Sequence, residues 1–227
     1  MSDDAVYLVP IGSGRFDLYA EPADEQEFGS NPRDGFWRRR AHQFHEGWRR
    51  VSRAAHTARG ADAGWLARLR DWFVRRIADS ITEQRTLWSL RDLTSAAFIY
   101  PADLTDESAA TLRDRLLAQA RRHHGWWLLF NLVAVVLTAV LILLPGPNLI
   151  GYYFAFRVIG HVLSWRGARQ GLIRISWRPR PEQALTELGG LVGVPREQRA
   201  GRVAALADRL QLARLEAFFD RRAIPAP

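Results

Sequence analysis

Two ionisable side chains stand four residues apart in an otherwise apolar part of the chain, Arg157 and His161. Residues at this spacing share one face of a helix, and Ser164 extends that face. Histidine titrates near neutral pH, and a neighbouring guanidinium disfavours its protonated form, so the pair is suited to sensing or relaying protons. The alternative is structural: Arg157 bonds carbonyl oxygens near a turn, and His161 donates to a neighbouring helix. The sequence leaves both interpretations open.

Other chemistry is weakly supported. His42, His45 and Glu46 fall within one helical turn, but no further protein ligand stands nearby, so a solvated helix face is favoured over a metal site. The chain has no cysteine, which excludes disulfides and thiolate metal sites. It also shows no Ser/His/Asp set, Walker loop, HExxH or Rossmann fingerprint. We therefore expect no enzyme, no cofactor and no metal.

The apolar stretch before Arg157 predicts a membrane-spanning helix. Trp126 to Leu144 is close to the roughly 20 residues that span a hydrocarbon core. Leu, Ile, Val or Phe occupy thirteen of the 17 positions in 128–144, which favours insertion by roughly 4–8 kcal/mol. A turn follows at Pro145-Gly146-Pro147-Asn148. We expect a helical hairpin in the bilayer.

The second arm, Leu149 to Trp165, is marginal by the same measure. Eight such residues supply roughly 2.4–4.8 kcal/mol, whereas one central arginine costs about 2.5–3.5 kcal/mol. The arm either spans beside the first or is re-entrant or interfacial. Arginines flank both ends of the hairpin and its tip is uncharged, so both termini are expected on the cytoplasmic side.

Composition limits the partners and the source. The net charge is +8, and all basic residues are Arg, which suits an anionic lipid surface or nucleic acid. Arg without Lys is typical of a GC-rich bacterial genome and carries little functional weight. The start MSDDAVYLVP lacks a signal peptide. A bacterial inner membrane is the expected location.

The flanking regions predict smaller elements. Residues 5–20 predict a β-hairpin around Gly12-Ser13-Gly14, with Pro10 placing the first strand at a sheet edge. Apolar spacing predicts helices over 34–59 and 62–81 that either pack together or lie on lipid headgroups.

Three further helices are expected. Thr105 can cap a helix that runs past Arg122 into the apolar stretch, because only Gly125 interrupts it. In the tail, helices are expected at about 182–192 and 196–220.

These elements predict a fold class and a domain order. We expect a mostly α membrane protein with one helical hairpin, a short N-terminal β-hairpin and amphipathic helices. The predicted regions are a β-hairpin at 1–22, a cytoplasmic helical region at 23–124, a transmembrane helical hairpin at 125–166 and a C-terminal cytoplasmic helical region at 167–227.

A family resemblance enters at the predicted hairpin. The motif comprises Leu144-Pro145-Gly146-Pro147-Asn148, Tyr152-Tyr153-Phe154, Arg157, His161, Ser164 and Gly167. It resembles the signature of the mitochondrial K+/H+ exchange-related family, as does the start Tyr7-Leu8-Val9-Pro10. The resemblance implies an inner-membrane protein associated with monovalent cation/proton exchange.

The expected function follows from the hairpin and the resemblance. The chain takes part in K+/H+ exchange or its regulation, as a homo-oligomer or with a membrane protein partner, because one hairpin encloses no ion path. The candidate ion- or proton-linked residues are Asn148, Arg157, His161 and Ser164, with Pro145, Gly146 and Pro147 forming the turn. The alternative is a non-transporting scaffold in the lipid bilayer that binds anionic lipid headgroups or a protein partner. A membrane-tethered nucleic-acid-binding protein is less favoured.

Overall fold

A four-stranded sheet forms the centre of the computed structural model, which describes residues 4–21, 86–139 and 149–223. Its strands lie in the order β2-β1-β3-β4. They are β1 (Ala5–Gly12), β2 (Arg15–Tyr19), β3 (Ser95–Pro101) and β4 (Ser176–Glu182). β1 pairs antiparallel with β2, whereas β1–β3 and β3–β4 are parallel pairs.

The N-terminal β-hairpin is confirmed, with Gly14 at φ 67° in its turn. The expected edge position of the first strand is wrong, because β1 lies between β2 and β3. Pro10 is tolerated there because the pairing with β3 covers only Ala5 to Tyr7. The missing N–H of Pro10 therefore removes no bond to β3.

The two strands that the sequence analysis did not identify, β3 and β4, complete the sheet. β3 is buried at most of its positions, as a strand covered on both faces must be. β4 carries Pro179 and Pro181, which normally argue against a strand. The Ser176 N–H donates to the Thr94 carbonyl beside β3. Backbone N–H groups point alternately to the two sides of a strand, so the nitrogens of both prolines face the open edge of the sheet. No hydrogen bond to β3 is lost there.

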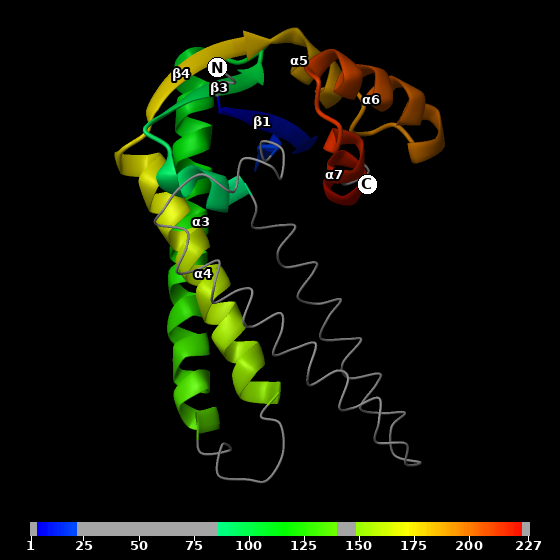
Figure 1. Cartoon of the computed structure of the whole chain (residues 1–227). Helices are drawn as coiled ribbons and strands as arrows, with labels where there is room; N and C mark the ends of the chain where they lie inside the picture. The colour runs from blue at the N-terminus through cyan, green and yellow to red at the C-terminus, as the bar shows by residue number, and fades with distance from the viewer. Residues whose placement is uncertain (1–3, 22–85, 140–148, 224–227) are drawn as a thin grey trace, which may run out of the picture. The chain divides into compact units, whose positions relative to one another are not determined.

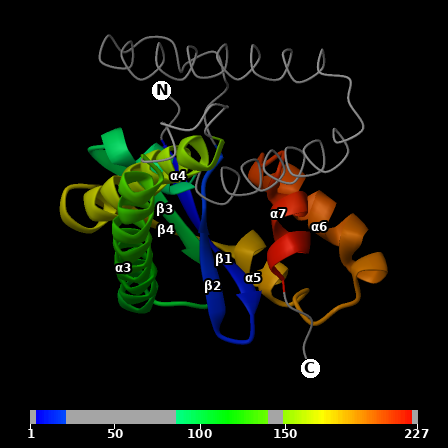
Figure 2. The ribbon, with the colours of Figure 1, turned by 90° about the horizontal axis from the view of Figure 1, so that it is seen from below.

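Helices cover both faces of this sheet (Figure 2). On one face lie parts of α3 (Asp106–Ala139) and α4 (Leu149–Ile173), with a core that includes Phe98, Leu117 and Leu90. On the other face lie α5 (Gln183–Gly189), α6 (Arg196–Leu210) and α7 (Leu215–Arg222), with a core that includes Val9, Leu188 and Phe219. The tail expected as one helix over 196–220 is two, because Gln211 adopts a left-handed φ of 57°.

The long helix α3 begins as the sequence predicts and continues without a break through Gly125. Its first turn is capped by Thr105, whose hydroxyl oxygen accepts the Ser108 N–H at 3.2 Å. At about 1.5 Å per residue, its 34 residues span about 51 Å, far more than the roughly 23 Å of a seven-residue strand. α4 then brings the chain back, so that β4 starts beside the beginning of β3 (Figure 1).

The described residues belong to two compact units. The first contains the sheet, residues 84–129, and everything from Ile159 to the C-terminus. Of the second unit, residues 130–139 and 149–158 are described. α3 and α4 each cross from one unit to the other.

The predicted fold class, a mostly α protein with a membrane-spanning hairpin, is wrong. The chain has a mixed α/β fold built on the four-stranded sheet. In the described ranges no helix combines the length and the apolar character needed to cross a bilayer. The error in secondary-structure class arose at β3 and β4, since their pairing joins segments far apart in sequence and β4 carries two prolines. The predicted turn at Pro145 to Asn148 and the helices at 34–59 and 62–81 lie outside the described residues.

Candidate functional site

Two buried histidines from different helices meet inside the first unit. Nδ1 of His124 on α3 lies 2.9 Å from Nδ1 of His161 on α4. The two residues are only 8% and 3% exposed. The Trp127 indole stacks on the His161 ring at 15°, and the exposed His123 stands edge-on to His124.

The short contact has a chemical requirement. One of the two Nδ1 atoms must carry a proton and the other must accept it. If both rings became imidazolium ions, two N–H groups would face each other and the contact would be repulsive. Burial lowers the pKa of His124 from 6.5 to about 3, with His161 and then His123 adding repulsion. His124 is therefore uncharged near neutral pH, and one N–H proton lies between the two Nδ1 atoms.

Close helix packing positions the pair. On α3, Leu117 and His124 stand seven residues apart on the face toward α4. A side chain at Gly171 would meet Leu117 at 3.0 Å, and one at Gly125 would meet Trp165 at 3.6 Å. These contacts, with that of His124 and His161, show that α3 and α4 run antiparallel at short separation. Small residues at the contact allow this approach.

The predicted residue Ser164 is buried on the same helix as His161, three residues further along. Its partner is a different segment, because the Trp88 indole N–H donates to Ser164 Oγ at 2.9 Å. Next to this bond, a Cβ at Gly167 would lie 1.7 Å from the carbonyl oxygen of Leu87. Ser164 therefore holds residues 86–92 against α4.

The predicted residue Arg157 belongs to the second unit. Its guanidinium donates to the hydroxyl of Tyr153, one turn earlier on α4, at 2.9 Å and lies 5.7 Å from that ring centroid. A shared role with His161 remains a prediction from spacing. Asn148 and the turn residues Pro145, Gly146 and Pro147 lie outside the described residues.

The sequence analysis did not select His124, which is the direct partner of His161. A signal was present: Leu117, His124, Asn131 and Thr138 recur every seven residues, and the first three are buried. Polar residues on such a seam face another helix. Because nearly every residue of the run after Gly125 is apolar, the seven-residue spacing of the polar side chains was overlooked.

In the described part of the chain, no group of three His, Asp or Glu residues is arranged to hold a metal ion. His42, His45 and Glu46 lie outside that part.

Fold and site together define a mixed α/β protein whose paired helices enclose a titratable histidine pair. The family model described as mitochondrial K+-H+ exchange-related matches residues 5–172. The chain therefore belongs to that family, which confirms the resemblance found at the PGPN motif. No curated protein and no solved structure matches the chain. The match ends within α4, so β4 and the C-terminal helices lie beyond it.

Proposed function

We propose that the chain takes part in monovalent cation/proton (K+/H+) exchange or its regulation, as an oligomer or an accessory subunit, with His124 and His161 as its proton-responsive element. The observation that carries the proposal is the 2.9 Å contact between two buried imidazole nitrogens. Membership of the K+-H+ exchange-related family supports the choice of ions.

The surroundings favour a response to protons over a fixed ion pair. No Asp or Glu occurs between Asp114 and Glu182, so neither helix offers a carboxylate beside the histidines. In the described ranges, the rings beside the pair include those of His123 and Trp127. Residues 86–92, packed on α4, carry Arg91 and Asp92, which pair with each other at 2.7 Å. Because two imidazolium rings at this separation would repel each other, acquiring a second proton weakens the contact between the helices.

An accessory role fits the architecture better than transport by one chain. In the described ranges, α3 and α4 do not enclose a path for ions by themselves, so ion flux is proposed to need further copies or a partner. The proposed place of action is the inner face of a bacterial inner membrane, with both termini on the cytoplasmic side. Anionic lipids there attract arginine-rich surfaces.

The test uses membrane vesicles from cells that make the chain naturally, compared with cells lacking its gene. We expect K+-driven proton movement, followed with a pH-sensitive dye, to fall without the gene and to return with the wild-type chain. His124→Gln and His161→Gln should restore exchange but remove its dependence on pH as the pH falls from 6.5 toward 3, the range set by the lowered pKa of His124. The matched control, His123→Gln, alters an exposed imidazole on the same helix and should keep the wild-type profile. Unchanged exchange without the gene refutes the proposal.

A second candidate is a scaffold that moves no ions and binds anionic lipid or a protein partner. Clustered exposed Arg and Trp side chains on α3 and α4 favour it. Loss of a membrane partner from detergent extracts of the gene-deleted cells, with K+/H+ exchange intact, would support the scaffold over the exchange role.

A further inference from the structure

One segment of the chain carries arginines but no acidic residues. Between Asp114 and Glu182 there are nine arginines and no acidic residue. This segment includes most of α3, all of α4 and most of β4. An excess of one charge sign in a segment creates a positive potential that attracts anionic partners.

Apolar side chains are exposed beside this charge in the first unit. Trp126 is 74% exposed, Leu129 53%, Trp127 39% and Ile159 42%. Exposed apolar clusters of this kind mark interaction sites in proteins. α3 continues from here with exposed Leu132, Val133, Val136 and Leu137.

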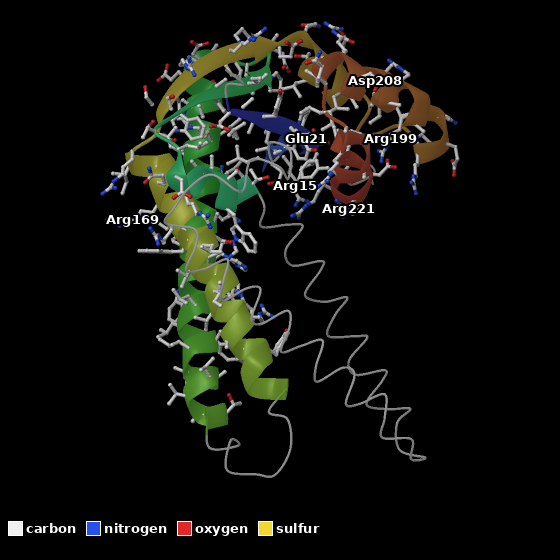
Figure 3. The ribbon with its side chains drawn as sticks, viewed as in Figure 1. Arg15, Glu21, Arg169, Arg199, Asp208 and Arg221 are labelled. Carbon is white, nitrogen blue, oxygen red and sulfur yellow. The ribbon has the colours of Figure 1, made fainter. Side chains whose placement is uncertain are left out.

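Because α3 and α4 run antiparallel, arginines of the two helices lie at the same height along the helix axes. Because His124 faces His161 and Gly125 lies against Trp165, the exposed Arg166 and Arg169 stand level with Arg121 and Arg122. We name this group the Arg–Trp belt. It comprises Arg121, Arg122, Trp126, Trp165, Arg166 and Arg169. The Arg169 guanidinium lies 5.8 Å from the Trp165 ring centroid, and Figure 3 shows Arg169 on α4, apart from Arg199 and Arg221 in the C-terminal helices.

The order along the helices matches the depth profile of a lipid surface. Arginine comes first, then tryptophan, then aliphatic residues toward Leu129 and Ile159. Phosphate headgroups, the interfacial region and acyl chains follow in the same order. We infer that the Arg–Trp belt docks this protein on a bilayer surface containing anionic phospholipid. The inference holds whether or not the chain moves ions.

Other occupants fit less well. A second copy would bring arginines against arginines. Nucleic acid would neutralise the arginines but leave Trp126 and Leu129 in water. An anionic bilayer supplies phosphate and hydrocarbon side by side, which satisfies both.

The absence of cysteine from the chain makes a clean labelling test possible. An environment-sensitive NBD label is attached to Leu129→Cys in the full chain and, as the control, to the exposed Ala205→Cys on α6. Vesicles of phosphatidylcholine with about 30% phosphatidylglycerol are added, the anionic fraction supplying the surface potential that attracts arginine. We expect a blue shift with increased intensity at position 129 only, absent with pure phosphatidylcholine and reversed by high salt.

A charge series tests the belt itself. Arg166→Ala with Arg169→Ala should weaken vesicle partitioning about fivefold for each arginine removed. Arg202→Ala with Arg214→Ala, two exposed arginines of the C-terminal part with the same charge change, should leave partitioning unchanged. Equal weakening by both pairs overturns the inference. So does a blue shift that appears without lipid and grows with protein concentration, or a chain that binds DNA but not vesicles. None of these outcomes bears on K+/H+ exchange, which is measured separately.

Discussion

Two helical layers cover the two faces of the sheet, and they differ in the charge of their sequences. α3 and α4 bury one apolar face against the sheet, and α5, α6 and α7 bury the other. Residues 183–222 mix five acidic residues with seven arginines, whereas residues 115–181 hold nine arginines and no acid. Residues 183–222 can therefore pair charges among themselves, whereas the arginines of residues 115–181 have no acidic residue in their own segment.

Arg199 is an example of an arginine that pairs with an acidic residue within the C-terminal helices. Its side chain is buried, donates to Asp220 at 3.3 Å and lies 4.9 Å from the Phe219 ring centroid. Asp220 also pairs with the exposed Arg196 at 2.8 Å. Arg169, in contrast, is exposed and lies over an indole. The charge of Arg199 therefore stabilises the fold, whereas the exposed charge of Arg169 can meet a partner.

The largest expected effect tests this contrast directly. Asp220→Ala leaves the buried Arg199 without its carboxylate, so the free energy of unfolding should fall by about 3–5 kcal/mol. Arg169→Ala removes an exposed charge and should change it by no more than about 0.5 kcal/mol. Urea unfolding followed by circular dichroism measures both. Equal losses would contradict the division of roles.

A second pair of variants compares the glycines of the two layers. Gly167→Ala places a Cβ 1.7 Å from the Leu87 carbonyl oxygen, a backbone atom, so the free energy of unfolding should fall by about 3 kcal/mol. Gly201→Ala on α6 meets nothing within 4 Å and should raise it by about 0.5–1 kcal/mol, the helix propensity gain. Thermal melting should thus move in opposite directions. A stable Gly167→Ala chain would show that residues 86–92 are not held on α4 by this close approach.

The third comparison is a pH dependence of stability that originates at His124 on α3. The folded state lowers the pKa of His124 from 6.5 to about 3, so the unfolded state binds the additional proton between these values. The histidine's contribution to stability is complete above pH 6.5 and is lost as the pH falls toward 3, by at most about 1.4 kcal/mol per pH unit. His124→Gln should remove this part of the slope from urea unfolding measured across that range.

His123→Gln is the control for this measurement, since it alters an exposed ring and should retain most of the slope. Identical slopes in wild type and His124→Gln would show that His124 is not held neutral by the fold.

Local patterns predicted the local elements correctly. The turn around Gly12 to Gly14, the cap at Thr105 and the unbroken helix through Gly125 each depend on neighbouring residues alone. The family was also recognisable from motifs in sequence. β4 was missed because it carries two prolines, which a strand accepts only where their nitrogens face an open sheet edge. β4 has such an edge because it pairs with β3 along its other side, and that pairing is not visible in the local sequence.

The sequence by itself determined the helix that runs from the Thr105 cap through Gly125 into an apolar stretch, a candidate histidine at position 161 and membership of the family. Only the tertiary structure decided which groups meet. His124 and His161 are 37 residues apart, and β3 and β4 are separated by the whole of α3 and α4. Residue spacing determines which side chains share one helix face, but the partner of a buried imidazole depends on how two helices pack, which small residues such as Gly125 and Gly171 permit without specifying.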